Sequence, residues 1–141
     1  MAVFTVVFAV AVIFLTALIV DGGIAMNAKQ RAADIAEQAA RAAAGDIDVA
    51  TLRNSGVAQI GPGACTMAGQ LVQRYAQGAS TGVDTVTSAA MDACQVLGAN
   101  TATVQVTITT RPLIPGILGS FTETARESAT AQCGITTGAP C

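Results

Sequence analysis

The first 20 residues form an uninterrupted apolar segment. They carry no charged side chain, and only Thr5 and Thr16 are polar. At about 1.5 Å per residue, a helix of this length spans roughly 30 Å, the thickness of the hydrocarbon core of a bilayer. The pattern predicts a membrane-spanning or closely packed helix and argues against a purely cytosolic enzyme.

A second helical pattern follows the joint Asp21-Gly22-Gly23. Apolar positions then recur every three or four residues, at Ile24, Ala28, Ala32, Ile35, Ala39 and Ala43. A polar stripe has the same spacing, formed by Asn27, Arg31, Asp34, Gln38 and Arg41. The pattern predicts an amphipathic helix that stops at Gly45. Because each glycine costs about 1 kcal/mol in a helix interior, we expect a kink or local melting at residues 21–23.

Two shorter helices are predicted in the middle of the chain. The first covers Cys65–Gln77 and ends at Gly78, with one apolar face formed by Ala68, Leu71, Val72, Tyr75 and Ala76. The second covers Thr87–Leu97, where Ala90, Ala93, Cys94 and Leu97 have helical spacing.

The last third of the chain has the pattern of strands. Thr101–Thr110 alternates strictly, with Val104, Val106 and Ile108 on one face. A loop containing Pro112 and Pro115 separates it from a predicted partner strand at Phe121–Gln132.

The predicted fold class is α+β: a long N-terminal helix packed on a small antiparallel sheet with two short helices. Three regions follow: an apolar helix over 1–20, an amphipathic helix over 21–45 and an exterior head over 46–141.

The four cysteines, Cys65, Cys94, Cys133 and Cys141, all follow the apolar segment. With no Cys-x-x-Cys and no histidine, zinc spacing is not met, so we interpret them as two disulfides formed in an oxidising compartment. Three pairings are possible, and we favour Cys65–Cys94 with Cys133–Cys141 because each joins neighbouring segments. The disulfides would staple the exterior head.

Little in the chain points to catalysis or to a cofactor. The chain has no histidine, a net charge of −2 and seven scattered basic residues, which argues against acid-base catalysis and tight nucleic-acid binding. Gly78-Ala79-Ser80-Thr81-Gly82 matches a nucleophile elbow by letter only, because no base exists for the serine. Asp46 and Asp48 are interpreted as a solvated turn rather than a cation site. We expect no catalytic residue, no metal site and no cofactor.

Two interpretations of the apolar segment remain open. The segment is too long for a secretory signal peptide, and it lacks the basic flank that such a peptide needs. The segment is therefore an ordinary transmembrane anchor, or the mature end of a protein whose basic leader has been removed. Lys29 and Arg31 on its C-terminal side would place the body in the cytoplasm, against the disulfides, and a removed leader resolves this conflict. Asp21 marks the membrane interface, or pairs with Lys29, Arg31 or another subunit's terminal amine.

The N-terminal 45 residues resemble the TadE/TadG-like proteins of bacterial Tad pilus systems. The likeness rests on the apolar helix, on Val20-Asp21-Gly22-Gly23, and on the alanine-rich segments Lys29–Asp34 and Glu37–Arg41. It implies a type IV pilin-like subunit that a prepilin peptidase cuts and that leaves the membrane to pack into a filament. Most type IV pilins carry glutamate at the fifth mature position. Thr5 stands there if Met1 is the mature end.

We therefore expect a non-enzymatic pilin that polymerises through its N-terminal helix into an extracellular filament. The filament-packing positions are the large apolar residues Val3, Phe4, Val7, Phe8, Val12, Phe14, Leu15 and Leu18. The expected partners are copies of the chain, the inner-membrane pilus assembly machinery and the peptidase, with the membrane as the location before assembly. The alternatives are a membrane-retained minor pilin or assembly factor and, more remotely, a membrane-anchored enzyme.

Overall fold

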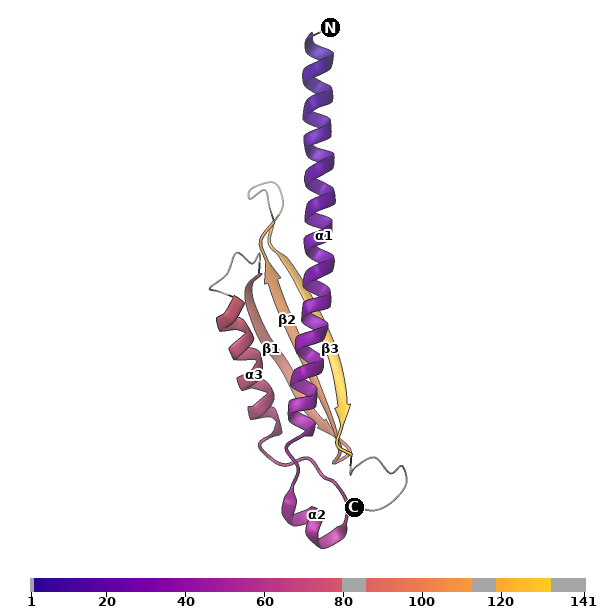
Figure 1. Ribbon diagram of the computed structural model, residues 1–141, viewed down its shortest axis with the longest axis vertical. Helices are drawn as coiled ribbons and strands as arrows, with labels where there is room; N and C mark the ends of the chain where they lie inside the picture. The colour runs from indigo at the N-terminus through magenta and orange to yellow at the C-terminus, as the bar shows by residue number, and fades with distance from the viewer. Residues whose placement is uncertain (1, 80–85, 113–118, 133–141) are drawn as a thin grey trace.

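The computed structural model describes residues 2–79, 86–112 and 119–132, and its longest element is the helix α1, Ala2–Ala44 (Figure 1). The helix continues through Gly22 and Gly23 without interruption. The expected local melting does not occur, and Figure 1 shows no sharp bend at this point. Glycine is a poor helix former, but helix propagation is cooperative, and long helical segments on both sides keep the two glycines helical.

The second half of α1 packs on the sheet through alanine side chains. Ala32, Ala36, Ala39 and Ala43 are completely buried, and Ile35 packs at the border of this cluster. The predicted polar stripe lies on the exposed side of the helix, and Arg41 forms an ion pair with Glu37 one turn earlier. The predicted amphipathic helix is therefore confirmed. Its small side chains let the helix backbone lie close to the strands while the interior remains tightly packed.

Three antiparallel strands form one sheet in the order β1-β2-β3. They are β1 (Val86–Leu97), β2 (Thr101–Thr110) and β3 (Phe121–Thr130). β2 is the central strand, and Val104, Val106 and Ile108 are buried beneath α1, as the alternation predicts. Both predicted strands in the last third of the chain are confirmed. The predicted loop between them lies partly outside the described residues.

The predicted helix over Thr87–Leu97 is wrong, because this segment is the edge strand β1. Its pairing with β2 shifts register between Val86 and Ser88 and again between Met91 and Ala93. Met91 lies just before the second shift and Cys94 just after it, and they are opposite the inward-facing Val106 and Val104, respectively. Two residues three positions apart thus share one face of the strand, which is a spacing typical of a helix.

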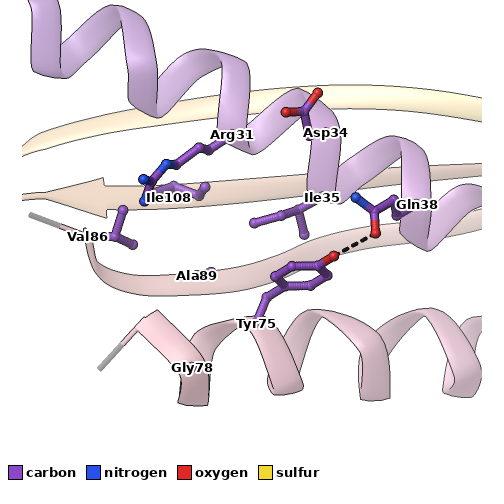
Figure 2. A pocket seen from close by; sticks show the side chains of 9 residues that line it. All are labelled: Arg31, Asp34, Ile35, Gln38, Tyr75, Gly78, Val86, Ala89 and Ile108. Carbon is purple, nitrogen blue, oxygen red and sulfur yellow. Dashed lines mark hydrogen bonds between the residues drawn. The ribbon is translucent and has the colours of Figure 1, made fainter. Parts of the chain in front are cut away.

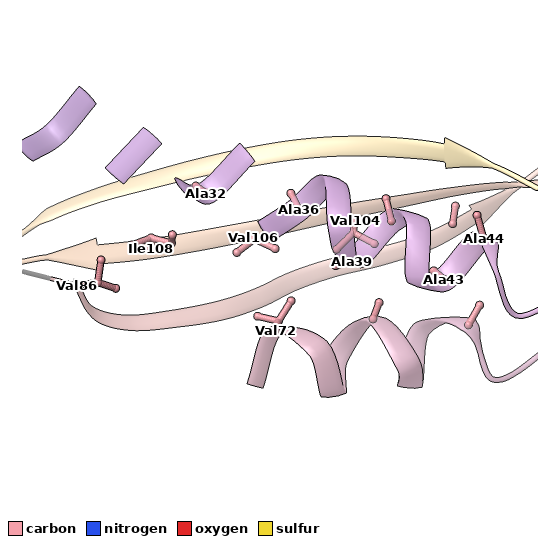
Figure 3. Packing of buried hydrophobic residues seen from close by; sticks show 14 residues of the cluster. Ala32, Ala36, Ala39, Ala43, Ala44, Val72, Val86, Val104, Val106 and Ile108 are labelled. Carbon is pink, nitrogen blue, oxygen red and sulfur yellow. The ribbon is translucent and has the colours of Figure 1, made fainter. Parts of the chain in front are cut away.

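Two shorter helices complete the fold. α3 (Ala64–Ala79) confirms the first predicted helix and packs chiefly on α1 and β1. Its buried residues Ala68 and Val72 join the core formed by α1 and the sheet (Figure 3). α2 (Val49–Ser55) lies at the end of the head farthest from the N-terminus (Figure 1). The second short helix is therefore α2, not the predicted segment at 87–97.

Candidate functional site: an exposed apolar helix

The N-terminal half of α1 extends beyond the head with its apolar side chains open to the surroundings (Figure 1). Val3 and Phe4 are 78% and 77% exposed, and even Val12 is 45% exposed. The other positions predicted to pack in a filament are also exposed: Val7, Phe8, Phe14, Leu15 and Leu18. We call residues 3–20 the apolar rod. The structure brings all eight positions onto this one helix and leaves their side chains 45–78% exposed.

The apolar rod meets the physical requirements of a membrane-spanning segment. α1 is long enough and apolar enough to cross a bilayer, by length and composition. The Thr16 hydroxyl donates a hydrogen bond to the Val12 carbonyl oxygen at 2.8 Å. The polar group is thereby satisfied inside the helix, which lowers the cost of placing it in hydrocarbon. The rod can exist in a bilayer or against other apolar helices, and an isolated rod in water would leave a large apolar surface exposed.

Asp21 marks the point where the apolar rod meets the head. This residue is only 2% exposed, whereas Gly22 and Gly23 beside it are exposed. A side chain added at either glycine would meet no atom within 4 Å. The sequence indicated the boundary of the rod at Asp21 but gave no signal that its carboxylate is buried. The proposed roles of Asp21, at the membrane interface or in pairing, remain predictions.

The disulfide between Cys65 and Cys94 joins the first turn of α3 to β1, and their Cα atoms are 5.7 Å apart. This pairing confirms the favoured prediction for these two cysteines. Cys133 and Cys141 lie outside the described residues. The disulfide fixes α3 on the edge strand of a head whose core is built largely from alanine and valine.

The sequence raised Asp48 as a possible cation ligand and Ser80 as a possible nucleophile. The structure describes Asp48 and gives it a structural role. Asp48 is the N-cap of α2, and its carboxylate accepts hydrogen bonds from the backbone N–H groups of Ala50 and Thr51 and from the Thr51 hydroxyl. Chiefly because of the bond from the Thr51 hydroxyl, the pKa of Asp48 lies below its ordinary value. Among the described residues no group of three or more His, Cys, Asp or Glu side chains could hold a metal ion. In the nucleophile-elbow pattern, Ser80, Thr81 and Gly82 lie outside the described residues.

An open cavity of about 360 Å³ lies between α1, α3 and the sheet (Figure 2). Its floor is aliphatic, and polar side chains of α1 and α3 form its rim; the lining comprises Arg31, Asp34, Ile35, Gln38, Tyr75, Gly78, Val86, Ala89 and Ile108. The sequence did not indicate this cavity, because the lining residues come from four separate elements. Among the lining residues that the structure describes, Tyr75 carries a hydroxyl group, and this group donates a hydrogen bond to Gln38.

These elements define a class of protein in which a helix long enough to span a membrane carries a small α+β head. Residues 1–46 match the family described as Tad: Putative Flp pilus-assembly TadE/G-like. This match covers α1 and the two residues after it, and it confirms the resemblance found in the sequence over that segment. No curated protein and no solved structure matches the chain. The N-terminal third is thus similar to a family of pilus assembly, a structural rather than an enzymatic process.

Proposed function

We propose that the chain is a pilin-like structural subunit that polymerises through the apolar rod into an extracellular filament of the Tad or type IV kind. One observation carries the proposal: an apolar surface of bilayer length projects from a folded, disulfide-linked head. Burying a Val, Leu, Ile or Phe side chain contributes about 1.5–3 kcal/mol, so the rod favours strongly any environment without water. The bilayer supplies that environment before assembly, and neighbouring rods supply it in the filament.

In this proposal the partners are other copies of the chain, the inner-membrane assembly machinery and a prepilin peptidase. The exposed positions Val3 to Leu18 form the contact between copies, and the head lies outside the bundle of rods. Because a rod that is apolar on all sides has no polar face to keep in water, it can be surrounded by several copies at once. Head-to-tail contacts of this kind extend into a helical filament when their rotation does not close a ring.

A membrane-retained assembly factor is the second candidate, and the word assembly in the description of the matching family favours it. The same apolar rod would then act as a permanent anchor. Both candidates predict a membrane-inserted precursor, and they differ in whether the chain ever leaves the membrane.

Shearing of whole cells distinguishes the two candidates. Filaments detached from cells are collected by centrifugation, and the chain is quantified in filaments and in membranes with an antibody against the head. We expect the chain as a regular component along the filaments, seen by immunogold labelling. Complete retention in the membrane fraction of cells that carry filaments contradicts the subunit proposal and supports the assembly factor.

A further inference from the structure

Two exposed basic side chains, Lys29 and Arg111, lie at the end of the head that adjoins the apolar rod. Lys29 is exposed on α1, about two turns beyond Asp21, where the head begins. Arg111 is exposed directly after Thr110, the last residue of β2, whose arrow in Figure 1 points toward the apolar half of α1. We call Lys29 and Arg111 the basic collar. At the opposite end of the head, α2 and its flanking turn contain Arg53 together with Asp46 and Asp48.

The unbroken helix sets the distance between the basic collar and a bilayer. Val20 is the last residue of the apolar rod, and Lys29 follows nine residues later in the same helix. At about 1.5 Å per residue, the Lys29 backbone lies roughly 13.5 Å beyond the hydrocarbon edge. Helical side chains lean toward the N-terminus, so the lysine stem extends back toward the bilayer and its ammonium approaches the headgroups.

Electrostatic attraction acts over this distance. The headgroup layer is about 5–8 Å thick on each side of the hydrocarbon, and the Debye length at physiological salt is about 8 Å. The nearest acidic groups compete only partly with the basic collar. Asp21 is buried, Glu123 on β3 is half-buried and lies opposite Ile108, and Asp34 lies farther along α1. Among the residues that the structure describes, the exposed charges nearest the membrane are therefore those of the basic collar.

We propose that the basic collar binds anionic phospholipid headgroups while the apolar rod occupies the bilayer. The inference rests on the proposed function only in requiring membrane residence before assembly. The collar would hold the head against the membrane surface and would lose this attraction when the subunit leaves for a filament. The chemical class of ligand is a phosphodiester headgroup that carries net negative charge, as in phosphatidylglycerol.

Lipid selectivity of the full chain tests the inference directly. The protein is reconstituted in phosphatidylcholine vesicles that contain a trace of spin-labelled phosphatidylglycerol or spin-labelled phosphatidylcholine. Electron paramagnetic resonance then gives the fraction of each probe immobilised next to the protein. We expect the anionic probe to be preferred, by up to about fivefold for each contributing cation at low salt, and the preference to fall as salt is raised.

Charge-neutralised variants separate the basic collar from the rest of the molecule. The double substitution Lys29→Gln and Arg111→Gln should remove most of the preference, and Arg53→Gln at the far end of the head should leave it intact. Circular dichroism and an intact Cys65–Cys94 disulfide verify that each variant is folded.

Two negative results have different meanings in this experiment. Immobilised lipid without a preference for the anionic probe, or a preference that survives the double substitution, overturns the proposed role of the basic collar alone. Absence of any immobilised lipid shows that the apolar rod does not enter the bilayer. That result contradicts the proposed function together with the inference.

Discussion

The Tyr75 hydroxyl of α3 donates a hydrogen bond to Gln38 Oε1 of α1 at 2.6 Å, which connects two helices across 37 residues of sequence (Figure 2). The bond lies at the rim of the cavity between these helices, above the aliphatic floor formed in part by Ile35 and Ile108. Tyr75 is 39% exposed, so water competes for both groups. The bond orients α3 relative to α1 more than it adds to the free energy of unfolding.

Removal of the Tyr75 hydroxyl should have a small, measurable effect. We expect Tyr75→Phe to lower the free energy of unfolding of the head by about 0.5 kcal/mol, the low end for a hydrogen bond, because both partners can bind water. Denaturant unfolding in detergent, followed by circular dichroism, measures the change. In a double-mutant cycle with Gln38→Ala, an interaction energy of zero shows that the two side chains do not couple.

The turn before α3 depends on two glycines that contact Asp46. A Cβ atom at Gly63 would lie 2.9 Å from Asp46 Oδ2, and a Cβ atom at Gly61 would meet the same oxygen at 2.9 Å. We expect Gly63→Ala to lower the free energy of unfolding by about 1–3 kcal/mol through this overlap. The same substitution in an Asp46→Ala background should cost much less, as measured by thermal unfolding.

The glycines of α1 provide the control for this steric argument. Gly23→Ala introduces a side chain with no neighbour within 4 Å, so it should cost nothing and favour the helix. If Gly63→Ala lowers the free energy of unfolding equally in the wild-type and Asp46→Ala backgrounds, the proposed contact is contradicted.

Loss of the Cys65–Cys94 disulfide should destabilise the head strongly. The two cysteines are 29 residues apart, and the loop-entropy model gives about 3.5 kcal/mol for closing a loop of this length. We expect the double substitution Cys65→Ser and Cys94→Ser to lower the unfolding free energy by about this amount. Thermal unfolding of the variant, compared with that of the oxidised and the reduced wild type, measures it. If the variant is as stable as the oxidised wild type, the disulfide does not contribute to the stability of the head.

The Asp48 cap predicts a dependence of stability on acid. The Thr51 hydroxyl and the backbone N–H groups of Thr51 and Ala50 keep the pKa of Asp48 below its ordinary value of 3.8. A lowered folded pKa gives stability that is present above the unfolded pKa and is lost as the pH falls through the folded pKa. Asp48→Asn retains a good N-cap without a titrating group, so we expect it to remove this part of the acid sensitivity.

Melting temperatures of wild type and Asp48→Asn between about pH 2 and 6 test this prediction, because ordinary carboxyl groups titrate in that range. The two proteins should be similar near pH 6, and the wild type should lose more stability on acidification. The prediction is contradicted if the melting temperatures of the two proteins fall in parallel as the pH is lowered.

A charge in the apolar rod should block assembly. Phe8 is 62% exposed in the single chain and would be buried between rods in a filament. We expect Phe8→Asp or Val12→Asp to abolish filaments, because an unpaired carboxylate in an apolar bundle is costly. Electron microscopy of sheared material and the circular dichroism of the head measure assembly and folding separately.

Val49→Asp on α2 is the matched control, since Val49 is also exposed but lies at the far end of the head. It should assemble normally. Normal filaments from Phe8→Asp overturn the bundled-rod proposal, provided that membrane fractionation shows the variant still to be inserted.

The sequence alone determined the elements whose pattern is regular over many residues. The apolar rod, the alanine stripe of α1 and the alternation of β2 each repeat one period, and this period follows from the local geometry of a helix or strand. The favoured pairing of Cys65 with Cys94 followed from their closeness in sequence. These features place the apolar rod, which is the candidate site, and define the faces that the head must bury.

Only the tertiary structure decided the features that depend on distant residues. β1 is a strand because β2 offers it a hydrogen-bonding edge, and its two register shifts give Val86, Ala89, Met91 and Cys94 a shared face at irregular spacing. Because of these bulges, residues three positions apart lie on one face of the strand, and this spacing resembles that of a helix. No local pattern in the sequence indicates the bulges. The burial of Asp21, the contact of Asp46 with Gly63 and the bond from Tyr75 to Gln38 likewise depend on how separate segments pack, since each is fixed by three-dimensional proximity.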